Sequence, residues 1–228
     1  MRVGNLIHLG LPIGNQKHIE EFFCEKFKKV EKSFYSLSSV GCNSKGLNYF
    51  IVSNIYKKFC QSIFYYGLET NYIRKDCLKK LDLRQSILIK NIFGLSKYSK
   101  TTPLLKALNI KSIVQLYEEY KILFLKQIRM NSMTNDIYKW LLEKYKNDMK
   151  PARESYFNIL IGVCNKYGID SNRINVKIAL ETITNEYTVA DYGLTDSIKF
   201  LISKSGSSEF DKVARNMLKL LLNVNFYT

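Results

Sequence analysis

Apolar residues recur at three- and four-residue intervals along most of the chain, which is the period of an amphipathic α-helix. The first such stripe lies between Asn15 and Leu37, and its other faces carry lysines interleaved with glutamates. Those charges are expected to form a solvated face with i,i+4 pairs, or a face on which some lysines follow a phosphate backbone. Further stripes predict helices over 47–66, 76–92, 104–108 and 112–130.

Capping and turn residues mark the ends of these predicted helices. Ser112 suits the N-cap of the helix over 112–130, and Thr102 followed by Pro103 suits the start of the short helix before it. Gly67 is a natural C-terminal residue, because glycine adopts the left-handed conformation without steric cost. The stripe over 112–130 includes Tyr120, Phe124 and Gln127, and its default interpretation is core packing.

The first residues follow a different pattern. Leu9, Leu11 and Ile13 alternate with other residues, which is the two-residue period of a β-strand. Gly10 and Pro12 interrupt this period, so a short, kinked edge strand or hairpin is predicted. The predicted fold class is mainly α, a helical array with one short N-terminal β-strand or hairpin. A lone strand pair needs a sheet to join, so the chain is expected to begin in the middle of a larger fold.

The polar stretch 131–136 is the best candidate for a boundary inside the chain. One helix is predicted directly after it, and further helices are predicted over 152–167, 172–186, 195–203 and 208–222. No catalytic motif occurs there, so this part is interpreted as a helical support or interaction region. The predicted organisation is a strand remnant over 1–15, a thumb-like helical region over 16–130 and a C-terminal helical region of unknown role over 131–228.

Four stretches resemble, in order and in spacing, the end of the palm and the thumb of reverse transcriptases from non-LTR retrotransposons. Residues 7–14 (IHLGLPIG) are similar to the family's "YLG" strand. Residues 66–69 (YGLE) are similar to its "YG-x-E". The remaining two blocks, LDLRQ followed by IFGL and then LLKALNI, begin at residues 81 and 104. The resemblance covers roughly residues 6–130, with His8 where the family usually has tyrosine.

The resemblance implies a C-terminal fragment of an RNA-directed DNA polymerase. The complete family enzyme binds two magnesium ions with palm aspartates, which stabilise the attacking and leaving oxygens. No Asp-Asp pair occurs anywhere in this chain. The chain is therefore expected to have no catalytic residue, metal site or cofactor of its own and to be inactive alone. The implied partners are an RNA or RNA–DNA hybrid template–primer and the palm and fingers of a complete enzyme.

Positive charge is concentrated in the thumb-like region. The chain has a net charge of +15, and residues 16–100 carry 16 Lys and Arg against 7 Asp and Glu. Residues 151–228 carry 9 against 8. A basic surface attracts phosphate backbones, although a lysine-rich composition also serves solubility alone.

Candidates for nucleic-acid contact come from two sources. The resemblance implies that His8, Leu9 and Gly10 lie on the primer-side strand. Charge and helix position add a larger group, which is Lys17, Lys28, Lys57, Lys58, Lys79, Lys80, Arg84, Lys97 and Lys100. Arg84 either holds neighbouring helices together or contacts nucleic acid. Tyr98 stands between two of these lysines, in an ordinary loop or in one that stacks on a base.

Cysteine and histidine spacing gives no metal-binding pattern. The five cysteines include no C-x-x-C pair, and neither histidine is near a cysteine cluster. The odd number of cysteines and their apolar surroundings predict reduced thiols of an intracellular protein, in the nucleus or the cytoplasm. No run of eighteen apolar residues and no signal peptide is found, so no membrane partner is predicted.

A second interpretation is an all-helical protein-interaction module with no nucleic-acid role. Its apolar stripes would be core or partner surface, and its lysines would serve solubility. The two interpretations differ in whether the basic residues form one continuous face and in whether binding weakens steeply with salt.

Overall fold

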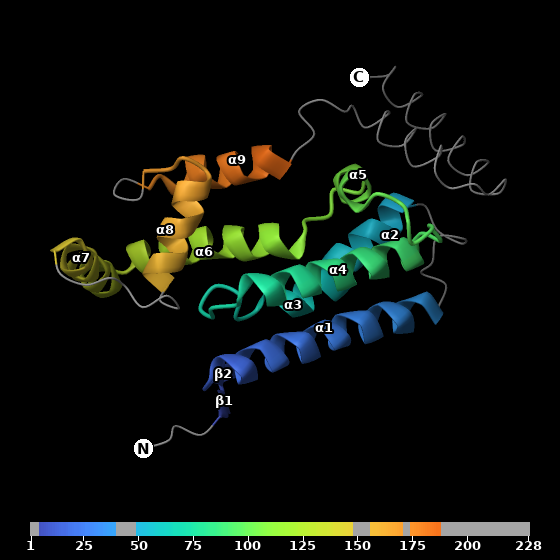
Figure 1. The fold of residues 1–228 in the computed structure, drawn as a ribbon, viewed down its shortest axis with the longest axis horizontal. Coiled ribbons are helices and arrows are strands. Elements are labelled where there is room, and N and C mark those ends of the chain that lie inside the picture. The colour runs from blue at the N-terminus through green and yellow to red at the C-terminus, as the bar shows by residue number, and fades with distance from the viewer. Residues whose placement is uncertain (1–4, 40–48, 148–155, 171–173, 188–228) are drawn as a thin grey trace.

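The computed structural model describes residues 5–39, 49–147, 156–170 and 174–187. This part of the chain is mainly helical, and its only sheet has two short antiparallel strands at the N-terminal end (Figure 1). The predicted fold class is therefore confirmed. The helices predicted over 195–203 and 208–222 lie outside the described residues.

The sheet is a hairpin, one of the two alternatives that the sequence predicted, and Leu9 lies in its turn. Strands β1 (Leu6–His8) and β2 (Leu11–Ile13) are antiparallel, and Leu6 lies opposite Ile13. Only two residues separate the strands, and only two more lead from β2 into the first helix. The hairpin is therefore directly continuous with the helical array.

The helices of the described part run from α1 to α9, with one π-helical stretch, η1. They are α1 (Gln16–Ser39), α2 (Tyr49–Ile55), η1 (Tyr56–Gln61), α3 (Ser62–Tyr65), α4 (Lys75–Ile92), α5 (Thr101–Ala107), α6 (Ile113–Met130), α7 (Ser132–Asn147), α8 (Tyr156–Lys166) and α9 (Val176–Tyr187). The single helix predicted over 47–66 is thus divided into three segments. Its π-helical turns place Gln61 inward, where Nε2 donates to the carbonyl oxygen of Lys111 at 2.8 Å.

The short helix α5 begins earlier than predicted. It starts at Thr101, and Lys100 before it has an extended backbone, so Thr102 is not its N-cap. Pro103 is the third helical residue, where its missing N–H has no intrahelical acceptor and therefore costs no bond. The cap predicted for the next helix is confirmed, because Ser112 Oγ accepts from the backbone N–H of Gln115 at 3.1 Å.

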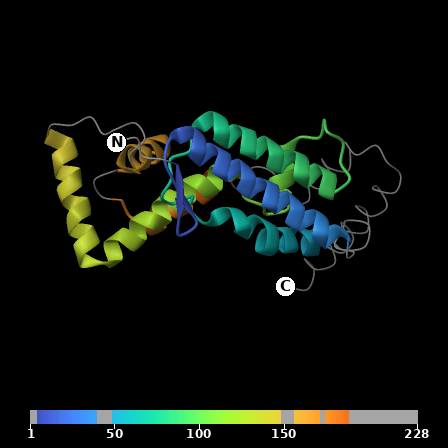
Figure 2. The ribbon, with the colours of Figure 1, turned by 90° about the horizontal axis from the view of Figure 1, so that it is seen from below.

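The first apolar core lies between α1 and the group formed by η1, α3 and α4. Phe23 and Phe27 of α1 both meet Phe64 of α3 edge to face, with ring centroids 5.8 Å apart in each pair. Val30 and Phe34 continue the same buried face of α1. α1 and α4 lie side by side and run in the same direction, as Figures 1 and 2 both show.

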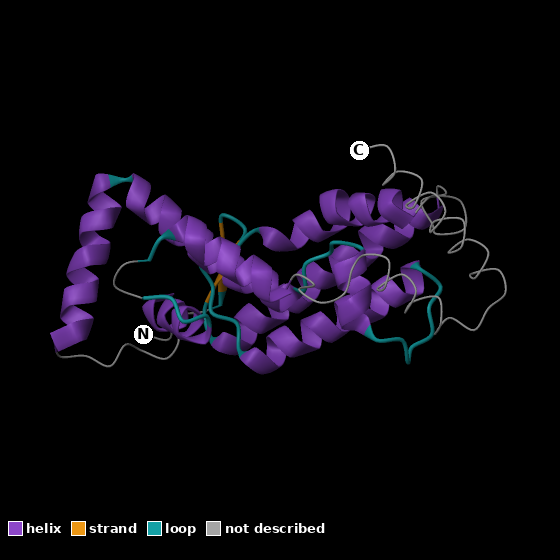
Figure 3. Cartoon of the chain, turned by 90° about the horizontal axis from the view of Figure 1, so that it is seen from above, coloured by secondary structure: helices purple, strands orange, loops and turns teal. Residues whose placement is uncertain are grey.

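α6 belongs to two cores. Ile113 and Leu116 near its start pack in the first core, whereas Ile122 and Leu125 pack with α8 and α9 in a second one. Only Asn131 separates α6 from α7, which turns sharply away from it (Figure 3). The bend falls at the predicted boundary, yet the regions on its two sides share α6. The division of the chain at residue 131 stays a prediction.

Candidate nucleic-acid interface

The hairpin exposes apolar side chains that a folded domain usually covers. Leu6, Ile7, Leu9 and Ile13 are all exposed, and Leu9 at the tip is 79% accessible. A two-stranded hairpin is at best marginally stable by itself in water. Contacts with the helices must therefore hold it in place.

The tip of the hairpin is a strained turn. Leu9 and Gly10 both have a positive φ, 48° and 76°. Two successive positive φ values are typical of a type I′ turn, in which asparagine or glycine is preferred at the first position. The left-handed conformation costs a leucine roughly 1–2 kcal/mol. A strained backbone persists where surrounding contacts fix it.

Tyr66 and Gly67, just after α3, supply those contacts. Tyr66 Oη donates to the carbonyl oxygen of Leu9 at 2.6 Å. Gly67 has a φ of 88°, and a Cβ there would lie 2.8 Å from Cδ2 of Leu11. The positive φ favours glycine here, and the absence of a Cβ leaves room for the Leu11 side chain of β2. The hairpin is thus fixed to the end of α3.

Lys121 of α6 holds the turn that follows Gly67. Its side chain is fully buried, and Nζ donates to the carbonyl oxygens of Glu69 (2.9 Å) and Asn71 (2.8 Å). The ammonium also lies 4.9 Å from the ring centroid of Tyr117. Burial lowers the pKa of Lys121 to about 7, and the Glu69 carboxylate opposes this shift.

Lys26 of α1 supports the same turn from another helix. Its Nζ donates to the carbonyl oxygen of Tyr66 and lies 5.0 Å from the centroid of that ring and 5.4 Å from that of Phe22. Burial lowers the pKa of Lys26 to about 8, and Glu69 again opposes the shift. These two lysines stabilise the turn after α3, and Lys121 is fully buried whereas Lys26 is partly buried.

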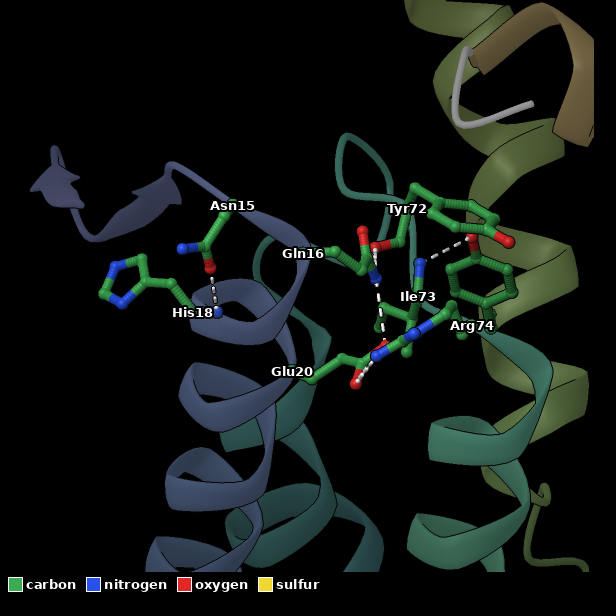
Figure 4. A network of polar contacts seen from close by, with 8 residues as sticks. Asn15, Gln16, His18, Glu20, Tyr72, Ile73 and Arg74 are labelled. Atoms are coloured by element: carbon green, nitrogen blue, oxygen red, sulfur yellow. Dashed lines mark hydrogen bonds and ion pairs between the residues drawn. The ribbon is translucent and has the colours of Figure 1, made fainter. Parts of the chain in front are cut away.

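A polar network ties the start of α1 to the start of α4 (Figure 4). Gln16 Nε2 donates to Glu20 Oε1 (3.1 Å) and to the carbonyl oxygen of Tyr72 (3.3 Å). Arg74 donates to both oxygens of Glu20, at 2.8 Å to Oε2. The Arg74 guanidinium holds the pKa of Glu20 below its usual value, against the effect of burial. This network sets the parallel alignment of α1 and α4 at the end nearest the hairpin.

Arg84 joins the same two helices further along. It donates through Nη2 and Nε to the two oxygens of Glu31, at 2.6 and 3.2 Å, and through Nη1 to the carbonyl oxygen of Cys24 at 3.3 Å. Its guanidinium lies 5.0 Å from the ring centroid of Phe27. The structure therefore gives Arg84 the helix-bridging role that the sequence left open, and its contact with nucleic acid stays a prediction.

We define the α1–α4 seam as the charged surface that these two helices share. Its members are Lys17, Glu20, Glu21, Glu25, Lys28, Glu31 and Lys32 of α1, Arg74 directly before α4, and Asp76, Lys79, Lys80 and Arg84 of α4. Lys28 pairs with Glu25 at 2.5 Å, and Lys17 approaches Glu21 at 3.9 Å. Seven cations stand against five carboxylates, so the seam keeps a positive excess that its own ion pairs partly neutralise.

The remaining predicted lysines lie on other elements. Lys57 and Lys58 are on η1. Burial lowers the pKa of Lys57, and the nearby charge of Lys58 lowers it further. Lys97 and Lys100 follow the C-terminal end of α4, and the Lys97 ammonium lies 5.0 Å from the ring centroid of the exposed Tyr98. α4 has 18 residues, a length of roughly 27 Å, so this loop and the hairpin are at opposite ends of the seam.

A pocket of about 560 Å³ opens between the end of α3 and α6. We call it the aromatic pocket, and we define it by the lining side chains Tyr65, Tyr66, Tyr120, Phe124, Glu69, Lys126 and Gln127. The rings of Tyr65 and Tyr120 are 5.2 Å apart, and Glu69 Oε2 accepts from the backbone N–H of Gly67 at 3.1 Å. The pocket therefore combines aromatic walls with an acidic, a basic and an amide group.

Sequence reasoning missed this pocket. Core packing is confirmed for Tyr120, which packs against the first core, whereas Phe124 is only partly buried and Gln127 is exposed. α6 is instead buried on a neighbouring face that includes Lys121. The tyrosines around Glu69 were the only available signal, because the other wall lies more than fifty residues later in the chain.

The described part of the chain offers neither a candidate metal site nor a candidate membrane-spanning helix. No group of three His, Cys, Asp or Glu side chains there is arranged as a metal site. None of the described helices is long and apolar enough to cross a membrane. Compared with known proteins, the chain matches no protein-family model, no curated protein and no solved structure.

Proposed function

We propose that this chain is the palm-end and thumb-like part of a reverse transcriptase of the non-LTR retrotransposon class. In this proposal it binds the backbone of a template–primer duplex and does not polymerise by itself. The observation that carries the proposal is the position of the hairpin. Its strained, exposed tip is held by Tyr66 at the end of the molecule where the α1–α4 seam begins.

The exposed hairpin supports the palm part of the proposal. Strand edges with free N–H and C=O groups readily accept another strand. Leu6 and Ile7 of β1 are exposed, so a sheet that paired with this hairpin would also bury apolar surface. A polymerase palm, in the same chain or in another, is a sheet of this kind.

The α1–α4 seam supports the duplex-binding part. α1 has 24 residues, roughly 36 Å, which is long enough to run beside several successive phosphates of a duplex backbone. Cations along such a length meet phosphates at several points, and contacts of this kind position a duplex without reading its sequence. The interleaved glutamates limit the affinity, so release is expected at moderate salt.

The test is binding of a fluorescein-labelled RNA–DNA hybrid, measured by anisotropy over a series of salt concentrations. The K79A/K80A variant removes two exposed cations of the seam. The matched control is K139A/K177A, which removes two exposed lysines of α7 and α9. Each lost phosphate contact should reduce the slope of log K against log salt by about 0.9.

We expect K79A/K80A to bind more weakly and to show a smaller slope of log K against log salt, and we expect the control to bind like the wild type. Absence of hybrid binding at low salt, or equal effects of the two variants, would overturn the duplex-binding claim. The family assignment has its own test, which is the reading frame upstream of Met1. A frame that continues and encodes a paired-aspartate turn supports the assignment, and a frame that continues into unrelated sequence opposes it.

The second candidate function is the protein-interaction module, which an exposed stripe favours. Met133, Ile137 and Trp140 recur at helical spacing on α7, Met130 lies at the end of α6, and all four are exposed. An amphipathic partner helix would cover such a stripe. Trp140 is the only tryptophan of the chain. A blue shift of its emission on partner binding, insensitive to salt, would support this function.

A further inference from the structure

We propose that the aromatic pocket binds one unstacked base of a single-stranded segment that continues from the duplex. This inference rests on the proposed function and adds a ligand class to it, a nucleotide outside the double helix. The inference is carried by the composition of the pocket, by the charges around it and by its connection to the hairpin tip.

The walls of the pocket suit a planar ring. Tyr66 is half exposed, and Tyr120 lies beside Tyr65 with 5.2 Å between the ring centroids. Aromatic side chains stack on any of the four bases, because every base has a π-face. The volume of about 560 Å³ lies within the range of pockets that hold small planar ligands.

Polar groups that line the pocket can form hydrogen bonds with the edge of such a base. Glu69 uses Oε2 for the Gly67 N–H, and a carboxylate has about four acceptor positions. It can therefore still accept from a base N–H, as acidic side chains do from the amino group of cytosine. Gln127 adds an amide with donors and an acceptor on the opposite wall.

The surrounding charges favour an anionic ligand over a cationic one. Aromatic walls with a carboxylate also suit a methylated ammonium group. Here, however, the Lys26 ammonium already lies 5.0 Å from the Tyr66 ring, and Lys126 lines the pocket. A second cation would be repelled by both lysines, whereas the phosphate attached to a base would be attracted.

Tyr66 connects the pocket with the hairpin. Its ring lines the pocket, and its hydroxyl donates to the carbonyl oxygen of Leu9 at the tip. A strand that leaves a duplex at the tip would therefore pass the mouth of the pocket. The base that enters would be separated from its neighbours, which is how proteins commonly recognise unpaired nucleotides.

The experiment compares two probes, a blunt RNA–DNA hybrid and the same hybrid with a few unpaired nucleotides at one end. Binding is measured by anisotropy for the wild type and for Q127W, which fills the pocket from an exposed position of α6. The control is E181W, which places the same ring on an exposed position of α9. E69Q keeps an acceptor for Gly67 but removes the charge.

The unpaired extension should raise wild-type affinity about fivefold or more. Q127W should abolish this gain while blunt-hybrid binding and the urea midpoint stay unchanged, and E181W should keep it. E69Q should reduce the gain most for bases that carry an amino group. A gain that survives in Q127W, or no gain in the wild type, overturns the pocket assignment alone. Failure to bind the blunt hybrid overturns the proposed function instead. Binding of trimethyl-lysine in place of the oligonucleotide overturns the claim that the pocket binds a base.

Discussion

Replacement of Lys121 by methionine should change how the stability of the protein depends on pH. The lysine is fully buried, and burial lowers its pKa to about 7 in the folded state, whereas an unfolded lysine titrates near 10.4. Between these two values the unfolded chain binds one more proton than the folded chain. The free energy of unfolding therefore rises with pH in this window.

The magnitude follows from the two pKa values. One proton of difference gives a slope of up to about 1.4 kcal/mol per pH unit. Integrated from about pH 7 to about pH 9, the contribution of Lys121 grows by about 2 kcal/mol. Below about pH 7 the folded chain must hold a buried ammonium, which two backbone carbonyls and the Tyr117 ring partly stabilise. K121M has no such group, so it should lack this pH-dependent gain.

The assay is urea unfolding of wild type and K121M at several pH values in this window, under reducing conditions. The quantity of interest is the difference between the two unfolding free energies. Lys26 and the buried thiols of Cys77 and Cys164 also have shifted pKa values, but they are common to both proteins and cancel in the difference. K79M removes an exposed lysine and should change stability little at any pH. A difference that stays constant from about pH 7 to about pH 9 would refute the lowered pKa of Lys121.

Substitutions at three further positions test the hairpin and the helix pairing by urea unfolding. R84M should cost about 1–3 kcal/mol, because it removes charge-assisted bonds to Glu31, and a loss no larger than that of K79M would contradict the bridging role. G67A should destabilise the protein by more than about 1 kcal/mol, because alanine would have to adopt a positive φ and its Cβ would meet the Leu11 side chain. A G67A variant as stable as the wild type would show that the turn and the Leu11 side chain can move apart. L9G should be more stable than L9A by about 1 kcal/mol, because only glycine adopts a φ of 48° freely, and equal stabilities would argue against a strained tip.

The sequence by itself determined the elements whose signals are local. Apolar spacing places most helices within a few residues of their observed ends, and the Ser112 cap is read directly from residue type, since its bond spans only three residues. The two-residue alternation with Gly10 and Pro12 likewise predicts a short edge strand or hairpin, although it does not place the turn at Leu9 and Gly10. These features depend on backbone geometry within one turn or one strand pair, so neighbouring residues are enough to predict them.

The tertiary structure decided which of two polar roles each charged residue takes. Lys121 and Lys79 are both lysines on amphipathic helices, yet one is buried against carbonyls and the other is exposed. Arg84 meets Glu31, a partner 53 residues away, because α1 and α4 align in parallel. The sequence is compatible with either role for these residues, because helical periodicity predicts which face is apolar but not which neighbouring helix covers it.

The aromatic pocket shows the same limit for the candidate site. Tyr65 and Tyr66 end α3, whereas Tyr120 and Phe124 lie on α6, and packing of these two segments creates the space between them. The apolar stripe of α6 predicts only that these rings are buried from solvent. Because α6 packs against different helices on two of its faces, the chain buries Lys121 and leaves Gln127 at the mouth of a pocket. That choice is set by long-range packing, which no short stretch of sequence encodes alone.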